Sequence, residues 1–498
     1  MFVTQNSELY RYEVHSLVKA FFPAEEVKVV ISEEMTPESA FGVFFSREKI
    51  RLLVRPGTPG ILSFSEEKDY EACACVPEGS DLSYCEKGPE TKAALKKLLY
   101  EFLVRMTGKN LPWGDLIGIR PTKLVSERLR SGLSEEECIR FMEEEHLVSH
   151  EKAVLAYDIA RREEEILGKL DRENGYSLYI GIPFCPTTCL YCSFPSFSLS
   201  AWAPEVDRYL DTLEREMAAA SALMQDKKLE TLYIGGGTPT TLEPKQLERL
   251  LTCIEKYYDL SGLLEFTVEA GRADSITREK LMVLRNHPVT RISVNPQTMR
   301  DETLRMIGRH HTVAEVIEAF QLARECGFDN INMDIILGLP GEKEEDVQYT
   351  VDEICKLSPE SLTVHSLAVK RASRLARWIE QNGIGLLHNS DESMAIAARA
   401  AQKMDMVPYY LYRQKNMSGN FENVGYAREG SFGIYNMLII EEVQSIMALG
   451  AGSISKCLFE GGRIERCDNA KEVRVYMDNI EEMIGRKRKL FAGLPVHS

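Results

Sequence analysis

Three cysteines in one short segment are the residues of this chain best suited to chemistry. Cys185, Cys189 and Cys192 have the spacing C-x3-C-x2-C, follow an apolar, strand-like segment and have no fourth cysteine nearby. Three thiolates in one loop can bind three irons of a [4Fe–4S] cluster, which leaves the fourth iron open for a ligand that is not protein. Four-cysteine ferredoxin sets instead close every iron and transfer electrons only.

An open iron can bind and reductively cleave S-adenosylmethionine (SAM), and radical chemistry of this kind uses SAM and an iron–sulfur cluster together. Zinc fits less well because it takes four ligands, commonly in two paired sets, and no matching C-x2-C or H-x3-H partner occurs elsewhere in the sequence. We therefore predict a [4Fe–4S] cluster on Cys185, Cys189 and Cys192, with SAM at the open iron.

A glycine-rich segment, Gly235-Gly-Gly-Thr-Pro239, is the second signal and comes one predicted strand–helix unit after the cysteines. Consecutive glycines let the backbone approach a ligand closely and adopt positive φ angles. We predict that their amides bind a small polar group, such as the amino-acid part of SAM. A phosphate-binding loop is disfavoured because no Walker lysine follows, whereas a plain turn would give the same pattern.

The composition excludes several classes of protein. The chain has 498 residues, 44% of them hydrophobic, and a formal net charge of −16. It is long enough for about three domain-sized units, and its acidity argues against a nucleic-acid partner, which needs a basic face. We see neither a signal peptide nor an apolar run long enough to span a membrane. A cytoplasmic location is therefore expected, with reduced thiols at the remaining cysteines.

Short apolar runs alternate with longer amphipathic stretches from Ser177 onward, which predicts parallel βαβ units. The predicted strands are residues 178–182, 231–234, 265–268, 291–294, 332–337 and 362–367. Six such units predict an α/β fold with an incomplete (β/α)6 barrel, and an open doubly wound sheet is the alternative. In both folds the chemistry lies at the carboxyl ends of the strands.

The distinctive polar and glycine residues fall where these predicted strands end. In chain order they are Cys185, Gly235, Glu269, Gln297, Gly338 and Ala368, with Asp334 inside the fifth strand. A core would have apolar residues at these points, so their common edge predicts a site.

The remaining chain is divided around this repeat. Residues 1–170 are predicted to form an N-terminal α+β module of unknown role, with strands between 27 and 54 and a helix at 95–106. Residues 171–370 would form the partial barrel. Residues 371–498 are mixed, with a helix expected at about 391–404, and are predicted to cover the substrate.

Three motifs together make the chain resemble the oxygen-independent coproporphyrinogen III oxidase family of radical SAM enzymes. These motifs are Tyr179-Ile-Gly-Ile-Pro-Phe-Cys-x3-Cys-x-Tyr-Cys192, Gly235-Gly-Gly-Thr-Pro239 and Asn332-x-Asp-x3-Gly-Leu-Pro340. The long N-terminal extension, Gly118-Ile-Arg-Pro-Thr-Lys123 and Tyr412-Arg-Gln-Lys-Asn416 are similar to its HemZ-type branch in particular.

The resemblance implies roles for matching residues, beginning with the three cysteines as cluster ligands. The residues implied to border or contact SAM are Tyr179, Tyr191, Gly236, Gly237, Thr238 and Glu269. Those matching a second SAM site are Gln297, Arg309 and Asp334, and Ala368 and Ile454 match residues that border SAM through backbone or apolar contacts. An arginine can hold a carboxylate in two parallel bonds, although Arg309 alone would equally suit a surface position.

The resemblance also implies an enzyme of haem biosynthesis. A reduced flavodoxin- or ferredoxin-type donor would reduce the cluster, and SAM would split into methionine and a 5′-deoxyadenosyl radical that takes a hydrogen from the β-carbon of a propionate. Loss of CO2 and one electron would leave a vinyl group; two such events convert coproporphyrinogen III to protoporphyrinogen IX. Lys370 and Arg371 are candidate propionate anchors because of their charge and position.

Two positions depart from the oxidase pattern. Gly181 stands where the oxidase has histidine, and Ser193-Phe194 stands where it carries a further cysteine two residues after the third. Relatives without that cysteine include haem-trafficking proteins. Two alternatives therefore stay open: a haem chaperone that keeps a cluster and delivers haem, and a radical SAM enzyme acting on another tetrapyrrole such as haem.

Overall fold

The structure is a computed structural model that describes residues 1–23, 25–45, 49–54, 71–75, 88–118, 120–194, 196–370, 373–414 and 420–492. It divides into two compact units, Met1–Ala160 with Arg413–Glu422 and Arg161–Tyr412 with Asn423–Ser498. The three-segment division proposed from the sequence stays a prediction.

The first unit contains a five-stranded sheet with the strand order β2–β1–β3–β4–β5. The strands are β1 (Phe2–Gln5), β2 (Lys28–Ile31), β3 (Ser39–Phe45), β4 (Lys49–Val54) and β5 (Glu71–Cys75). Strand β1 is parallel to both neighbours, whereas β3, β4 and β5 are antiparallel. The helices of this part of the chain are α1 (Arg11–Phe21), α2 (Pro89–Thr107), α3 (Pro121–Arg130), α4 (Glu135–His146) and α5 (His150–Leu167).

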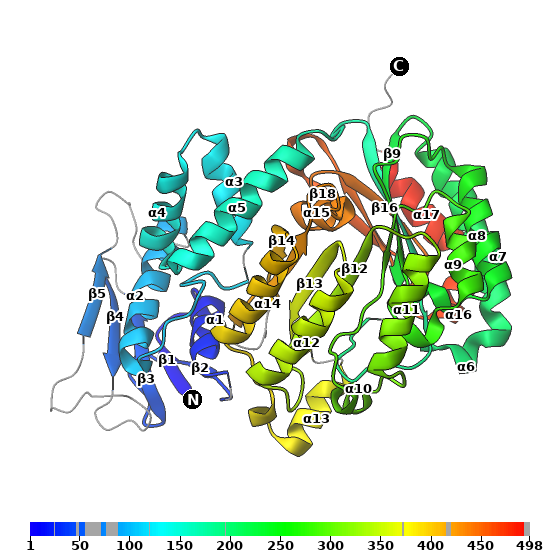
Figure 1. The fold of residues 1–498 in the computed structure, drawn as a ribbon. Coiled ribbons are helices and arrows are strands. Elements are labelled where there is room, and N and C mark those ends of the chain that lie inside the picture. The colour runs from blue at the N-terminus through cyan, green and yellow to red at the C-terminus, as the bar shows by residue number, and fades with distance from the viewer. Residues whose placement is uncertain are drawn as a thin grey trace. The chain divides into compact units, whose positions relative to one another are not determined.

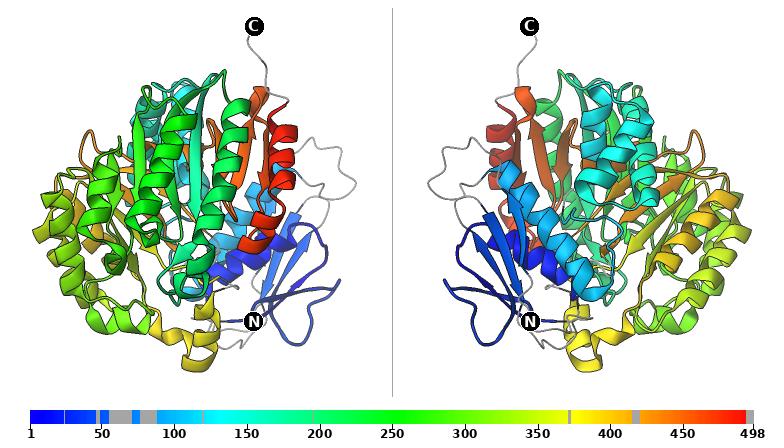
Figure 2. Two further views of the ribbon diagram at one scale, coloured as in Figure 1. Left: turned by 90° about the vertical axis from the view of Figure 1, so that its right-hand side faces the viewer. Right: turned by 90° about the vertical axis from the view of Figure 1, so that its left-hand side faces the viewer.

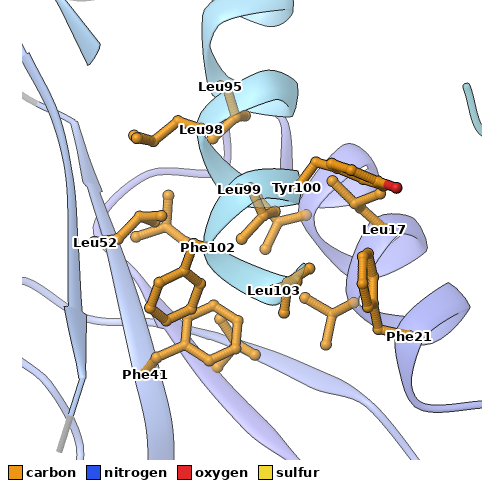
Figure 3. Close-up of a cluster of buried hydrophobic side chains, with 14 of the residues drawn as sticks. Leu17, Phe21, Phe41, Leu52, Leu95, Leu98, Leu99, Tyr100, Phe102 and Leu103 are labelled. Atoms are coloured by element: carbon orange, nitrogen blue, oxygen red, sulfur yellow. The ribbon is translucent and has the colours of Figure 1, made fainter. Parts of the chain in front are cut away.

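Helix α2 contributes many of the buried side chains of this unit's core, because its apolar residues recur at helical spacing and share one face. Figure 3 shows α2 between α1 and the sheet, with Phe102 beside Phe41 of β3 and Tyr100 beside Phe21 of α1. Both ring pairs meet edge to face, with centroids 5.1 Å and 5.4 Å apart, a geometry that aromatic pairs prefer. The helix predicted at 95–106 is thereby confirmed.

The second unit is built on one eleven-stranded sheet with the order β14–β15–β13–β12–β11–β10–β9–β6–β16–β17–β18. The first six of these strands along the chain are β6 (Gly175–Ile182), β9 (Lys228–Gly236), β10 (Glu265–Glu269), β11 (Arg291–Ser293), β12 (Ile331–Leu337) and β13 (Ser361–Ser366). The last five are β14 (Val407–Tyr412), β15 (Asn423–Ala427), β16 (Ser445–Leu449), β17 (Ile454–Leu458) and β18 (Ile464–Asp468). A separate small ladder pairs β7 (Phe184–Cys185) with β8 (Phe197–Ser198).

The six strands predicted from the alternating pattern are all present and are parallel neighbours in chain order, from β6 to β13. The two strands at the ends of the sheet, β14 and β18, are not paired with each other in the described chain. The predicted incomplete barrel is therefore confirmed, and its polar strand ends share one edge.

Helices follow the parallel strands and lie on the outer face of the sheet, as Figures 1 and 2 show for α7, α8, α9, α11 and α12. Their bounds are α7 (Val206–Leu223), α8 (Pro244–Tyr257), α9 (Arg278–Arg285), α11 (Val313–Glu325) and α12 (Glu344–Leu357). Two short helices, α6 (Leu199–Trp202) and α10 (Asp301–Met306), come before α7 and α11. None of the helices in the described ranges combines the length and apolarity that a membrane crossing requires.

The chain after residue 371 continues the same sheet. Strand β15 pairs antiparallel with β13, and β14 pairs antiparallel with β15. Strand β16 pairs in parallel with β6 at the other side of the parallel set. The helices here are α13 (Arg374–Asn382), α14 (Asp391–Lys403), α15 (Ile434–Glu441), α16 (Val473–Asp478) and α17 (Ile480–Phe491). Helix α14 confirms the helix expected at about 391–404, whereas the substrate-covering role of this segment stays a prediction.

Candidate functional site

The three cysteines lie in the loop that leaves β6, at the carboxyl edge of the parallel strands. All three are free thiols; Cys189 is buried, and Cys185 and Cys192 are partly exposed. The loop is fixed to the segment after α10, because the Leu190 amide donates to the Ile307 carbonyl at 2.8 Å and the Thr187 hydroxyl donates to the Gly308 carbonyl at 2.9 Å. The loop shape is therefore maintained by neighbouring backbone as well as by its own sequence.

The donor set in this loop suits an iron–sulfur cluster better than a single ion. Among the described residues, no group of three or more His, Cys, Asp or Glu side chains is placed to hold one metal ion. A four-iron cluster does not need its ligands to converge on one ion, because each cysteine thiolate binds a different iron. Burial raises the pKa of Cys185 to about 11 and also raises the pKa of Cys192. These thiols are therefore neutral until a metal displaces their protons.

The glycine-rich segment at the end of β9 is packed against the start of the cysteine loop. A Cβ on Gly237 would lie 2.5 Å from the Phe184 carbonyl oxygen, and Gly236 has φ +107°; only glycine meets both demands without strain. The Gly237 amide donates to the Ile182 carbonyl at 2.8 Å, and the Thr238 amide donates to the Phe184 carbonyl at 2.7 Å. The amides of Gly237 and Thr238 are therefore already used within the protein, and the binding of a ligand by the glycine amides of this segment stays a prediction.

The contact of this segment with the cysteines is made by a side chain. The Thr238 hydroxyl lies 3.5 Å from the Cys185 sulfur. The SAM contacts expected of Gly236, Gly237 and Thr238 stay predictions, and the glycines have a clear structural role in bringing β9 against the loop.

Three tyrosine rings stack beside the carboxyl ends of β6 and β9. The rings of Tyr179 of β6, Tyr233 of β9 and Tyr435 of α15 form a triangle: the Tyr233 centroid is 6.2 Å from that of Tyr179 and 4.6 Å from that of Tyr435, and the Tyr179 and Tyr435 centroids are 6.3 Å apart. The Tyr233 hydroxyl donates to Glu269 Oε1 at 2.5 Å. Burial raises the pKa of Glu269 to about 7, against the effect of this hydrogen bond and with a further contribution from the charge of Asp334. The Glu269 carboxyl therefore titrates near neutral pH.

Asp334, the second carboxylate at this edge, has the opposite behaviour. Burial favours its neutral form, but hydrogen bonds from His365 and Asn332 outweigh burial and lower its pKa. The Asn332 amide lies 2.6 Å from Asp334 Oδ1, and His365 Nε2 lies 3.7 Å from Oδ2. Gln297, with φ +69°, is joined to the same strand because its amide donates to the Asp334 carbonyl at 2.9 Å. The strand edge thus has one carboxylate that stays ionised, Asp334, and one that titrates near neutral pH, Glu269.

Arg309 connects the cysteine loop to the ends of β10 and β11. Its side chain is almost fully buried (5% exposed) and donates to the Asn295 carbonyl at 2.5 Å and to the Tyr191 hydroxyl at 3.4 Å. Within the described part of the chain, Arg309 Nε and Asn295 Oδ1 are buried without a hydrogen-bond partner. Unpaired buried polar atoms are costly, so their presence here fits a place for a polar ligand.

Arg272 is a buried residue of this site that the sequence analysis did not single out. It is 4% exposed, donates to the Thr187 hydroxyl at 3.1 Å and places Nη1 3.7 Å from the Cys189 sulfur. A signal was present, since Arg272 comes three residues after Glu269 and hence just beyond a strand end. The position alone does not identify a site residue, because arginines are ordinarily exposed.

Of the remaining predicted residues, Ala368, Ile454 and Lys370 lie in the described part of the chain. Ala368 follows β13 and is half-buried, and Ile454 begins β17 with 45% of its surface exposed. Lys370 places its ammonium group 5.8 Å from the ring of Phe194, which is 68% exposed. Arg371 lies outside the described residues.

A buried network supports β6 from the side of the C-terminal chain. Gly450 has φ +93°, and a Cβ there would lie 2.4 Å from the Gly181 carbonyl oxygen. The Gly450 amide donates to Glu216 of α7 at 2.8 Å, and Glu216 also pairs with Lys487 of α17 at 2.7 Å. Tyr476 and Asn469 donate to the same carboxylate at 2.7 Å and 2.8 Å. The network therefore fixes the loop that packs on the carboxyl end of β6.

Sequence comparisons give relatives along most of the chain. Residues 179–354 match the family described as the Radical SAM superfamily. The chain is 40% identical to the oxygen-independent coproporphyrinogen-III oxidase-like protein HemZ of Bacillus subtilis, over 82% of this chain and 83% of that protein. It is also 40% identical to the heme chaperone HemW of Bacillus subtilis, over 39% of this chain and 51% of HemW.

A solved structure gives the same fold. The coproporphyrinogen III oxidase HemN of Escherichia coli, described as a radical SAM enzyme, aligns with a TM-score of 0.50 and 22% sequence identity, over 63% of this chain and 71% of HemN. The oxygen-independent coproporphyrinogen III oxidase of Salmonella typhimurium is 31% identical in sequence, over 39% of this chain and 42% of the oxidase.

Proposed function

This chain belongs to the radical SAM family of oxygen-independent coproporphyrinogen III oxidase-like proteins, and from that premise we propose that it converts coproporphyrinogen III to protoporphyrinogen IX by oxidative decarboxylation of two propionates. The family uses a [4Fe–4S] cluster and SAM. The observation that carries the proposal is the cysteine loop at the end of β6, with Thr238, Glu269, Arg309 and Asp334 gathered along the same strand edge.

Cys185, Cys189 and Cys192 would hold the cluster, since they are free thiols in one fixed loop. When bound, the cluster and SAM supply one-electron chemistry that removes a hydrogen atom from a substrate C–H bond. The protein orients both partners and keeps water and oxygen away from the reacting atoms. The buried position of Cys189 and the packing of Phe184 against the glycine-rich strand end serve that exclusion.

The charged groups of the edge suit the polar parts of SAM. Arg309 presents a buried guanidinium, which can hold a carboxylate in two parallel bonds, and Asp334 stays ionised to accept from an ammonium or a ribose hydroxyl. Glu269 would do the same once it has lost its proton. Tyr179, Tyr191, Gly236, Gly237, Thr238, Gln297, Ala368 and Ile454 complete the proposed SAM contacts.

An exposed aromatic ring and an ammonium group lie beside the cysteine loop and suit the substrate. Phe194 offers a flat apolar surface to a tetrapyrrole, and Lys370, 5.8 Å from that ring, offers a positive charge to a propionate. If Lys370 binds a propionate, Lys370→Ala should raise the KM for coproporphyrinogen III several-fold and leave cluster content unchanged. The exposed Lys356→Ala serves as the matched control, and an unchanged KM in both variants would remove Lys370 from the substrate site.

A reduced flavodoxin- or ferredoxin-type protein is the proposed electron donor, and the proposed location is cytoplasmic. The second candidate function is a haem chaperone. It is favoured by the 40% identity to HemW and by Phe194, which replaces the further cysteine of the oxidase pattern.

The deciding experiment is an anaerobic assay of the reconstituted protein with reductant, SAM, coproporphyrinogen III and cell extract to supply an electron acceptor. 5′-Deoxyadenosine and protoporphyrinogen are quantified together. The oxidase proposal expects both products, each dependent on the porphyrinogen. Neither product from protein with an intact cluster would overturn it. Stoichiometric haem binding would then support the chaperone, and SAM cleavage that responds to haem would support an enzyme acting on another tetrapyrrole.

A further inference from the structure

Arg272 occupies a fixed place beside the cysteine loop. It follows β10, and its guanidinium faces the loop on one side, with Nη1 3.7 Å from the Cys189 sulfur and 3.4 Å from the Thr187 carbonyl oxygen. Nη2 donates to the Thr187 hydroxyl at 3.1 Å. One arginine thus contacts both a cysteine and the backbone two residues before it.

The other side of the same guanidinium is held by Asp274. Arg272 Nε and Nη2 donate to the two carboxylate oxygens at 3.0 Å and 2.7 Å, the bidentate geometry that fixes an arginine most firmly. His311, fully buried, lies 3.6 Å from the same carboxylate. Asp274 therefore aims the remaining nitrogen, Nη1, at the Cys189 sulfur.

The charge of Arg272 is permanent, because a guanidinium stays protonated in proteins. A thiolate-bound cluster becomes more negative by one charge when it is reduced, so a buried positive charge at one of its sulfurs stabilises the reduced form. Net charge and hydrogen bonds to the sulfurs are among the features that set the potential of an iron–sulfur cluster. With Arg272 almost fully buried, solvent screens this interaction little.

We propose that Arg272 is a positioning residue that holds the cysteine loop through Thr187 and raises the reduction potential of the cluster through its charge at Cys189, with Asp274 setting its orientation. The inference rests on the proposed role of Cys189 as a cluster ligand and is independent of which substrate the protein uses.

The test is a potentiometric titration of the reconstituted full-length protein without SAM, followed by the electron paramagnetic resonance signal of the reduced cluster. Arg272→Gln is expected to shift the one-electron equilibrium at least tenfold toward the oxidised form, which is a midpoint about 59 mV more negative. Arg272→Lys keeps the charge and should retain most of the potential. The exposed Arg305→Gln is the matched control and should not change it.

Asp274→Asn gives a prediction of opposite sign. It removes the negative charge that offsets Arg272 but keeps one side-chain oxygen that accepts from the guanidinium and holds its orientation, so the midpoint should become less negative, even if the loop holds less iron. A purely structural role for Arg272 would lower iron content and leave the midpoint of the remaining clusters unchanged. An unchanged midpoint in Arg272→Gln, or a more negative one in Asp274→Asn, would overturn the inference. Retention of iron by Cys189→Ala would instead overturn the ligand assignment on which it rests.

Discussion

Replacing Lys487 by Met should destabilise the second unit more than any ordinary substitution on helix α17. Lys487 pairs with Glu216 at 2.7 Å, and the two side chains are 2% and 0% exposed. Without the ammonium group, the Glu216 carboxylate keeps its three neutral donors from Gly450, Tyr476 and Asn469 but has no counter-charge. Removing one partner of a buried ion pair costs about 3–5 kcal/mol, because the other charge stays buried and unpaired.

For a unit of this size, each kcal/mol lowers the melting temperature by about 2 °C, so Lys487→Met should melt about 6–10 °C lower. The measurement is calorimetry and urea unfolding of the metal-free protein. Lys489→Met on the exposed face of α17 is the control and should stay within about 0.5 kcal/mol of the parent.

The double variant Glu216→Gln with Lys487→Met separates charge from packing. A glutamine keeps an acceptor oxygen for the Gly450 amide and the Tyr476 hydroxyl, and Asn469 Nδ2 keeps the Gly450 carbonyl as an acceptor, so no unpaired charge is left. The double variant should therefore cost about 1–2 kcal/mol, well below the sum of the single variants. Strict additivity, or a Lys487→Met protein that melts with the control, would refute the reasoning.

Three further predictions concern the strand edge. Burial raises the pKa of Glu269 from 4.5 to about 7. Between these two pH values the folded protein keeps a proton that the unfolded chain releases. The free energy of unfolding of the metal-free protein should therefore fall by about 3 kcal/mol as the pH rises from 4.5 to about 7. Glu269→Gln should abolish this slope in urea unfolding measured from pH 4.5 to 7.5, and a parent slope of zero would contradict the assignment. SAM affinity of the reconstituted protein, followed by calorimetry, should rise with pH through about 7, and Tyr233→Phe should move that rise to higher pH because it removes a hydrogen bond that lowers the Glu269 pKa; a pH-independent affinity would argue against a SAM contact. Gly450→Ala should lower the free energy of unfolding by about 2–3 kcal/mol, because it combines a positive φ with a backbone clash. Gly461→Ala, at φ +76° in open space, should lower it by only about 1 kcal/mol. Equal losses in thermal unfolding would show that the clash relaxes.

The parallel part of the fold was predictable because each strand from β6 to β13 is a compact apolar run separated from the next by a helix-length segment. The strands after residue 371 were missed for physical reasons. Strand β16 is buried at all five positions, but the antiparallel strand β17 follows it instead of a helix, so it lies outside the repeated βα pattern. Strand β15 is antiparallel to both of its neighbours, β13 and β14, and a search for repeated βα units does not find such strands.

The candidate site was predictable where a strand end and an unusual residue type coincide, as at Cys185 and Glu269. It was not predictable where the role depends on a neighbour distant in sequence. The amides of Gly237 and Thr238 are used by Ile182 and Phe184, more than 50 residues earlier in the chain. The contact of Arg272 with Cys189 likewise spans 83 positions in sequence.

The pairing of β16 with β6 implies an order of events during the synthesis and folding of this chain. Strand β6 leads directly into the cysteine loop, yet one of its two sheet partners, Ser445–Leu449, is translated more than 260 residues later. Until then the growing chain has β6 as an open edge, the type of surface that recruits stray strands. Insertion of the cluster is therefore expected after synthesis of the C-terminal quarter of the chain. A ribosome that stalls before residue 445 would leave a product that contains the three cysteines but lacks β16, the strand that pairs with β6.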